Sequence, residues 1–500
     1  MPLNSRNTIA VNVTSSVVQV VITGIVYFFV YRILVIKLGV EMLGVWSLII
    51  ATASISNLSN FGFNSAVVKY VAEYNAKAES ERINKLIYTS LIFISILFII
   101  LAAIIYLGAF LFIDKLIDPQ YTEMALVILP ISLTGLFFYS LCNVLTSAIE
   151  GFQKNYIRNF AYAFASVLYL FLAIILIPRS GLTGLAIAQV IQIIVVLIIS
   201  YYYLKRYTTG FGILRIKWYR DVFVELLEYG YKMQLISIFQ ILTDPITKIL
   251  ISRFHGISTL GFFEMASRMI TQLRQIIAGM DQVTIPIVSH FQQTEKKTVR
   301  YIYEKGFSFI IFIVFPLYAG IILFTPYLSR IWIGNVEPVF VYSTYILATG
   351  MLINILNAQA YFNSLGEGHL SGVLFMTLFV LIFNTLSGII FGLTVPVYGV
   401  VIAYAISTAL GSVLLIRYYH KKNNIRLVEI LKRSDIIIIL SGIVFALLSG
   451  IVLTEINKQY DYSYKIMLFY LIIYFTFFFL VSHKNDNFKL LNIFQYFSKH

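Results

Sequence analysis

The 500-residue chain contains one cysteine, Cys142, and few charged residues. With a single thiol, neither an intramolecular disulfide nor a cysteine-based metal site can form. Only 12% of the residues are charged, against about 25% in a typical soluble domain. The six histidines are scattered without the spacing of a ligand set, so we expect no metal site.

The chain also lacks the short signatures of common enzymes. It has no Gly-x-Ser-x-Gly elbow, no P-loop and no His-Glu-x-x-His motif. Its longest polar connection, 205–228, is too short for a catalytic domain. We therefore expect no catalytic residue. A membrane polysaccharide polymerase or ligase, the enzyme alternative, would be expected to have a large outer loop.

Long apolar runs dominate the sequence. Hydrophobic residues make up 59% of the chain and its mean hydropathy is +0.85. Runs of about 18 or more apolar residues predict membrane-spanning helices. About fourteen can be marked: 9–31, 43–66, 86–113, 122–147, 157–178, 182–204, 229–253, 260–288, 306–328, 339–363, 370–392, 396–417, 436–454 and 465–482. The N-terminus has no signal-peptide pattern, so the first helix should remain. The sequence predicts an all-α polytopic membrane protein.

Positive charge predicts the orientation of these helices. With the N-terminus in the cytoplasm, most of the 37 Lys and Arg residues fall in cytoplasmic segments, as the positive-inside rule requires. Both termini are then cytoplasmic. The excess positive charge, +14 over the whole chain, is therefore expected mainly at the cytoplasmic membrane surface, where it faces anionic lipids. Because the basic residues are dispersed, we expect no nucleic-acid partner.

An internal repeat relates the two halves of the chain. The stretch from Gly39 through Gly44 resembles that from Gly256 through Gly261 at an offset of 217 residues. Glu150-Gly151 matches Glu367-Gly368 at that offset, and Gly184 matches Gly399 at 215. Six spans per copy give two lobes related by a pseudo-two-fold along the membrane normal. The predicted parts are an N-lobe (1–206), a cytoplasmic linker (207–228), a C-lobe (229–420), and two extra C-terminal helices with a cytoplasmic tail (421–500).

One predicted helix, Leu260–Pro286, is unusually charged. It carries Glu264, Arg268, Arg274 and Asp281. Ionised side chains at bilayer depth cost about 2.5–3.5 kcal/mol each on insertion scales and usually face a bundle interior or a water-filled cavity. The preceding segment adds Asp244 and Lys248. These two segments are the predicted working part of the protein.

The stretches Leu38–Leu48, Asn60–Ala66 and Lys69–Glu73 resemble the N-terminal signature of bacterial O-antigen and polysaccharide flippases. The region from Asp244 to Pro286 is similar to the seventh and eighth helices of that family. The family belongs to the multidrug/oligosaccharidyl-lipid/polysaccharide (MOP) exporter superfamily. The resemblance implies transfer of a polyprenyl-pyrophosphate-linked oligosaccharide from the cytoplasmic to the outer leaflet.

Arginines are the predicted phosphate-binding residues. A guanidinium keeps its charge when buried and offers a planar fork to phosphate oxygens. The candidates for binding the substrate are Arg274, Arg268, Arg32 and Lys248. The alternative is structural, with Glu264 and Arg268 pairing at i,i+4 and Asp281 neutralising Arg274.

Carboxylates are the candidates for coupling to an ion, H⁺ or Na⁺. Asp244 lies one turn from Lys248 and beside Pro245, which removes a helix hydrogen bond and favours a kink. Asp244, Asp281 and Glu264 are therefore the ion-coupling candidates. Pairing of Asp244 with Lys248 is the structural alternative.

Amides form two predicted polar faces. Asn57, Asn60 and Asn64 follow helical spacing in the second segment, and Asn354 and Asn357 follow it in the tenth. Such amides either bind sugar hydroxyls in a cavity or hydrogen-bond between packed helices. Both interpretations stay open.

These features together predict a flippase of the bacterial inner membrane that works by alternating access, with a cationic cavity for the pyrophosphate and glycan. The expected partners are the lipid-linked oligosaccharide, anionic lipids and, as a candidate, the glycan polymerase machinery. No cofactor is expected apart from the coupling ion. A cation-coupled multidrug or small-solute antiporter is the main alternative.

Overall fold

The computed structural model describes residues 4–60, 63–112, 119–212, 217–281, 296–431 and 435–442, together with residues 288, 433, 472 and 476. Nearly all of the predicted segment 465–482 and most of 436–454 lie outside this range. All regular elements among the described residues are helices. Ten of them are long and apolar enough to cross a membrane. The protein is an all-α, multi-pass membrane protein.

The described residues form two compact units, each considered by itself. The first unit comprises residues 1–265 and 381–400, and the second the remainder. This grouping places α7 and the start of α8 with the N-terminal helices. The lobe boundary at 207–228 stays a prediction from the repeat.

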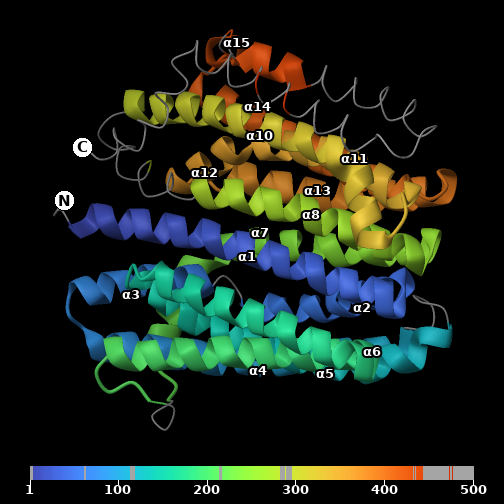
Figure 1. Cartoon of the computed structure of the whole chain (residues 1–500). Coiled ribbons are helices and arrows are strands. Elements are labelled where there is room, and N and C mark those ends of the chain that lie inside the picture. Colours follow the sequence, from blue (N-terminus) through green and yellow to red (C-terminus); the bar gives the residue numbers. More distant parts are fainter. Residues whose placement is uncertain are drawn as a thin grey trace. The chain divides into compact units, whose positions relative to one another are not determined.

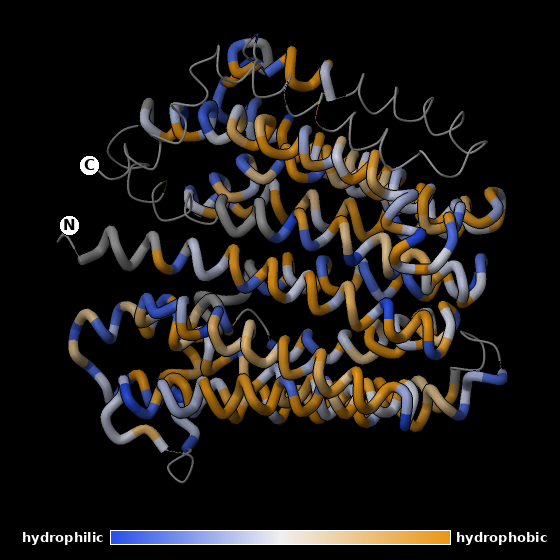
Figure 2. Tube along the Cα trace, viewed as in Figure 1, coloured by the Kyte–Doolittle hydropathy of each residue, from blue (hydrophilic) through white to orange (hydrophobic). Residues whose placement is uncertain are grey.

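The first unit contains eight elements in full (Figure 1): α1 (Asn4–Leu38), α2 (Val40–Ser54), the 3₁₀ helix η1 (Ile55–Asn60), α3 (Phe63–Ala76), α4 (Ser80–Phe112), α5 (Pro119–Gly151), α6 (Asn155–Tyr207) and α7 (Arg220–His255). It also contains the beginning of α8 (Ile257–Asp281) and the second half of α13 (Ser371–Thr394). Helices α4, α5 and α6 are hydrophobic along most of their length, with hydrophilic residues towards their ends (Figure 2).

The second unit contains the rest of α8 and the first half of α13, together with α10 (Lys296–Ile333), α11 (Pro338–Leu356), α12 (Ala358–Gly366), all but the first two residues of α14 (Gly399–Asn423), and the short α15 (Leu427–Ile430). Helix α8 contains four ionisable side chains and is not among the ten apolar spans. It is nevertheless a continuous helix from Ile257 to Asp281.

Two predicted spans, 157–178 and 182–204, lie in the single long element α6. A straight helix of its 53 residues would be about 80 Å long, more than twice the roughly 30 Å of a bilayer core. Gly181 interrupts α6 with a left-handed backbone (φ 57°). The element is therefore two crossings joined at one glycine.

The repeat is visible in the local backbone. Gly39, between α1 and α2, has φ 91° and ψ 163°, and its partner at offset 217, Gly256, has φ 85° and ψ 166° between α7 and α8. A side chain rarely adopts a positive φ, so both turns require glycine. At offset 215, a Cβ on Gly184 would meet the carbonyl of Leu176, and one on Gly399 would meet the carbonyl of Phe391, also 215 residues later. The two copies thus fold in the same way at these positions.

The second predicted span, 43–66, is not one α-helix. Helix α2 ends at Ser54, and the chain tightens into η1 before α3 begins. Ser54 and Ser56 donate their hydroxyls to the carbonyls of Ala51 and Ala53, at 2.7 and 2.6 Å. Such back-bonding competes with the regular helix ladder. Asn57 and Asn60 therefore do not share an α-helical face with Asn64, and the predicted polar face was wrong in its geometry.

Candidate functional site

A buried ionic cluster lies in the first unit, where α7 meets α8. The Lys248 ammonium is 2.9 Å from Glu264 Oε2 and 3.0 Å from Asp244 Oδ2. The side chains of Lys248 and Glu264 are 8% and 6% exposed, whereas that of Asp244 is 49% exposed. The cation is thus held between one buried and one half-exposed carboxylate. The pairing of Asp244 with Lys248 matches the structural alternative drawn from their spacing.

Two hydroxyls from the N-terminal helices also hydrogen-bond to Glu264. The Tyr31 hydroxyl of α1 donates to Oε1 at 2.8 Å, and the Ser47 hydroxyl of α2 donates to Oε2 at 2.7 Å. Hydrogen bonds to an ionised acceptor are among the stronger ones. Three donors from three other helices therefore stabilise the charged form of this carboxylate. We call Asp244, Lys248, Glu264, Tyr31 and Ser47 the ionic cluster.

Helices α2 and α8 approach each other very closely beside this cluster. A Cβ built on Gly44 would lie 2.0 Å from the carbonyl oxygen of Ile257, and one on Gly261 would lie 2.3 Å from that of Val40. Real Cβ atoms do not approach so closely, so the helices can cross here only at glycine. We call Val40, Gly44, Ile257 and Gly261 the glycine crossing.

The glycine crossing is reciprocal under the repeat. Adding the offset of 217 converts Val40 into Ile257 and Gly44 into Gly261, so the contact of Gly44 with Ile257 becomes that of Gly261 with Val40. Reciprocal contacts of this kind define an isologous, two-fold interface. The contact between α2 and α8 is therefore itself approximately two-fold symmetric.

The candidate arginines lie in both units. Arg32, on α1 of the first unit, is half-buried. In the second unit Arg268 is half-buried, and Arg274, about 1.7 turns further along α8, is exposed. The side chain of Asp281 lies outside the described residues, so its predicted pairing with Arg274 stays a prediction.

The two groups of candidate amides have different surroundings. In the second unit, Asn354 and Asn357 donate to the same hydroxyl, that of Ser412, at 3.0 and 2.8 Å. These contacts join α11 and the start of α12 to α14. The pattern matches the packing interpretation of these amides.

In the first unit, the corresponding oxygens have no hydrogen-bond partner. The Oδ1 atoms of Asn57, Asn60 and Asn64 are buried and unpaired, as is the hydroxyl of Ser59. They lie at the break between α2 and α3. Buried polar atoms without partners are rare and call for an explanation.

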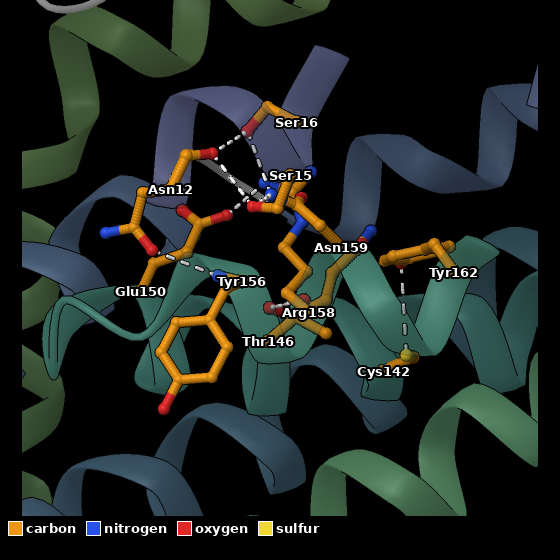
Figure 3. A network of polar contacts seen from close by, with 11 residues as sticks. Asn12, Ser15, Ser16, Cys142, Thr146, Glu150, Tyr156, Arg158, Asn159 and Tyr162 are labelled. Carbon is orange, nitrogen blue, oxygen red and sulfur yellow. Dashed lines mark hydrogen bonds and ion pairs between the residues drawn. The ribbon is translucent and has the colours of Figure 1, made fainter. Parts of the chain in front are cut away.

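A polar network that the sequence analysis did not identify joins α1 to α6 (Figure 3). Asn159 of α6 donates to the hydroxyls of Ser15 and Ser16 at 2.9 and 2.8 Å, and Asn12 accepts from the backbone N–H of Tyr156 at 3.1 Å. The spacing of residues 12, 15 and 16 on one helical face was the available signal. Because each of these hydrogen bonds joins α1 to α6, we assign the network a role in holding the two helices together.

A second set of contacts absent from the sequence analysis lies in the second unit. The Tyr303 hydroxyl and His420 Nε2 are 2.7 Å apart, and Ser308 donates to the fully buried Asp435 at 2.9 Å. Tyr419 donates to Glu367 at 2.8 Å. Each pair joins residues far apart in the chain, so local spacing gave no signal.

The described residues contain no group of three or more His, Cys, Asp or Glu side chains that could hold a metal ion. What the ionic cluster can do chemically is exchange partners. A carboxylate shared by a lysine and two hydroxyls can release one donor when helices move, or accept a proton. A cluster of this kind can therefore break and re-form its contacts if α8 moves relative to α1 and α2.

Comparison with known proteins was made for both sequence and fold. Residues 33–336, more than half of the chain, match the model of a family described as polysaccharide biosynthesis protein. A search of curated proteins gives no significant match.

Several solved structures share the fold. A multidrug resistance MATE transporter of the MOP superfamily, in an inward-facing conformation, has 19% identity and a TM-score of 0.69, over 82% of this chain and 98% of that one. The lipid II flippase MurJ, in an inward closed conformation, has 15% identity and a TM-score of 0.70, over 93% and 98%. A MOP transporter from Pyrococcus furiosus has 17% identity and a TM-score of 0.64, over 84% and 96%.

Proposed function

Since the chain belongs to the family of polysaccharide biosynthesis proteins and has the fold of MOP-superfamily transporters, we propose that it is a flippase for a lipid-linked oligosaccharide. The substrate would be a glycan repeat unit on polyprenyl pyrophosphate, moved from the cytoplasmic to the outer leaflet. On this proposal the protein sits in the bacterial inner membrane with both termini in the cytoplasm, as the distribution of Lys and Arg predicts.

The observation that carries the proposal is the glycine crossing. Alternating access needs two halves that close at one end of the pathway and part there later. At this crossing α2 and α8, which belong to different repeats, approach so closely that only glycine fits at positions 44 and 261. We take this crossing as the contact that closes the pathway and parts during transport.

The ionic cluster supports the same mechanism. Glu264 of α8 is bonded to Tyr31 and Ser47, which precede the predicted linker, and to Lys248 of α7. These hydrogen bonds and this ion pair stabilise the closed state beside the glycine crossing. When the crossing opens, Glu264 would keep Lys248 and exchange the two hydroxyls for water. On the predicted topology, the start of α2 faces the outside, so this is the outer end of the pathway.

The arginines would bind the anionic part of the substrate. A buried pyrophosphate without compensating cations would be prohibitively costly to desolvate. Arg268 and Arg274 follow each other along α8, and Arg32 lies on α1. The polyprenyl tail would remain in the lipid.

The proposal is tested by deleting the protein in its own host. Surface glycan should disappear while lipid-linked repeat units accumulate on the inner leaflet. If the units reached the outer leaflet but remained unpolymerised, a polymerase or ligase function would replace the proposal. The glycan polymerase that uses the flipped product is the expected functional partner.

A cation-coupled antiporter is the second candidate, and the likeness to MATE transporters favours it. An antiporter for drugs would need carboxylates rather than arginines for its cationic substrates. Uptake of a fluorescent cation into inverted vesicles, driven by a Na⁺ or H⁺ gradient, distinguishes the two. Robust drug transport that survives Arg268→Gln and Arg274→Gln would favour the antiporter.

A further inference from the structure

The two carboxylates of the ionic cluster are held in different ways. Glu264 receives the Lys248 ammonium and two hydroxyls, and its side chain is 6% exposed. Among the described residues Asp244 has one ion pair, with Lys248 at 3.0 Å, and its side chain is 49% exposed. Asp244 is therefore the partner of the lysine that can be exchanged at the lower cost.

The repeat places the cluster where the two copies of the fold meet. At the offset of 217 residues, Lys248 of α7 corresponds to Tyr31 of α1. Both side chains contact Glu264, the ammonium at 2.9 Å and the hydroxyl at 2.8 Å. Glu264 thus lies between equivalent positions of the first helices of the two repeats. Substrate sites of transporters built from repeats lie at the interface between the repeats.

The charges of the cluster belong to one copy alone. Three charged positions of the second copy are neutral in the first, where Asp244, Lys248 and Glu264 correspond to Tyr27, Tyr31 and Ser47. The fold that both copies share therefore does not require these charges. Ionisable residues within membrane helices generally mark the path of a substrate or an ion.

The depth of Asp244 indicates what its exposed side faces. It lies eleven residues before His255, the last residue of α7, which is about 16 Å along the helix. This distance is about half of the roughly 30 Å hydrocarbon core. An ionised carboxylate is costly against lipid at that depth, and such groups usually face a water-filled cavity. The exposed side of Asp244 is therefore expected to face water within the protein.

The carboxylate of Asp244 occupies the position of an anion on Lys248. Carboxylate and phosphate oxygens bind an ammonium group in similar, charge-assisted hydrogen bonds. With Asp244 in place, two carboxylates surround one ammonium, and the net charge of the three groups is −1. Without it, the net charge is zero. A pyrophosphate is repelled in the first arrangement and not in the second.

A cation is a poorer match to this site than an anion. The Lys248 ammonium already contacts both carboxylates, at 2.9 and 3.0 Å. A second cation on the same oxygens would lie beside the ammonium, and like charges at short distance repel. Exchange of one anion for another keeps the lysine paired throughout.

We propose that Asp244 is an internal counter-ion, which the pyrophosphate of the substrate displaces from Lys248 while Glu264 stays paired with the lysine. The inference rests on the proposed function, because it requires an anionic lipid-linked substrate. It also explains how the substrate leaves. A pyrophosphate held only by cations would dissociate slowly, whereas the return of Asp244 to Lys248 competes with it and favours its release.

The test measures the binding of radiolabelled inorganic pyrophosphate to the full-length protein in detergent, by equilibrium dialysis at constant ionic strength with a chelator present. In Asp244→Asn the Kd should fall about tenfold, because the competing charge is gone while Lys248 keeps Glu264. Asp244→Ser, which also removes the charge, is the second variant and should behave in the same way. Asp244→Glu keeps a competing carboxylate, so its Kd should stay close to that of the wild type.

Glu73→Gln is the matched control. Glu73 and Lys77 form another acid–lysine pair at i,i+4, with 2.7 Å between the charged atoms. The substitution changes the net charge of the protein by the same amount as Asp244→Asn, but on the exposed surface of α3. The Kd for pyrophosphate should not change. An equal fall in Kd in both variants would reveal a general effect of charge and would overturn the proposal.

The remaining outcomes separate the inference from the function on which it rests. If the wild type binds pyrophosphate and Asp244→Asn binds it with the same Kd, Asp244 is not a competing counter-ion, and the proposed function stands. If neither protein binds pyrophosphate, both proposals fail, because the pathway must then hold some other group. Unfolding midpoints measured without pyrophosphate verify that each variant is folded.

Discussion

Ser47 and Glu264 are hydrogen-bonded at 2.7 Å and are equivalent positions in the two repeats, one offset of 217 residues apart. Glu41 and Ser258 are also equivalent positions, 217 residues apart, and the Ser258 hydroxyl donates to Glu41 Oε1 at 3.2 Å. In the first pair α8 supplies the acid and α2 the serine, and in the second the roles are exchanged. An acid at both positions of either pair would place two carboxylates against each other. In each pair the acid is accordingly present in one copy and a serine in the other.

The glycine crossing should not tolerate a methyl group. In Gly44→Ala the new Cβ would overlap the Ile257 carbonyl, so α2 must move away from α8. Overpacking of this kind costs about 1–3 kcal/mol, sometimes more. We expect a lower unfolding midpoint and reduced surface glycan at matched expression. In the control Gly108→Ala, nothing lies within 4 Å of the new Cβ, and the midpoint should stay the same or rise.

The ionic cluster should show strong coupling in a double-mutant cycle. Lys248→Met or Glu264→Gln alone leaves a buried charge with fewer partners, a change that costs about 3–5 kcal/mol in buried pairs. The double variant should recover much of this stability, as measured by the yield of monodisperse protein and by its unfolding midpoint. Additive effects of the two substitutions would contradict the pairing.

The exposed pair of Lys77 and Glu73 provides the control for this cycle. Their side chains are 55% and 42% exposed, and such surface pairs contribute about 0–1 kcal/mol. Lys77→Met and Glu73→Gln should therefore change the midpoint little, singly or together.

A disulfide across the two repeats should stop transport reversibly. Glu41→Cys with Ser258→Cys, in a Cys142→Ala background, places two thiols where the native side chains are hydrogen-bonded. Oxidation should cross-link α2 to α8, hold the crossing closed and abolish the appearance of surface glycan. Reductant should restore it, and the single-cysteine variants should be unaffected. Full transport by the cross-linked protein would refute opening at this crossing.

Arg274 tests the binding of pyrophosphate. Arg274→Lys keeps the charge but loses the bidentate fork, so partial transport is expected, whereas Arg274→Ala should retain very little. If Arg274 only neutralises Asp281, Arg274→Gln combined with Asp281→Asn should restore surface glycan. We expect no restoration. Arg206→Lys and Arg206→Ala, at an exposed position near the end of α6, should both transport normally.

The sequence predicted those features that depend on local pattern. Apolar runs gave the helices, and the repeated glycines gave the equivalence of Gly39 with Gly256, which share one backbone conformation. The hydrogen-bond donors around Glu264 were not predictable in this way. Spacing along α8 offers only Arg268 as its partner, whereas Tyr31, Ser47 and Lys248 come from other helices.

The break in α2 shows a second limit of pattern. Hydropathy treats 43–66 as one apolar run, because serine and asparagine lower its mean only slightly. The hydroxyls of Ser54 and Ser56 nevertheless compete for backbone carbonyls and tighten the helix. The asparagine face, calculated for a regular helix, was therefore misplaced.

The glycine crossing also constrains how relatives of this protein can diverge. Gly44 lies directly against Ile257, and Gly261 lies directly against Val40. A larger residue in either helix can therefore fit only if the other helix changes as well. Among descendants of one duplicated gene, substitutions at these four positions should therefore occur in compensating pairs. A lineage that lost both glycines would have had to shift the two helices apart, and with them the end of the pathway that they close.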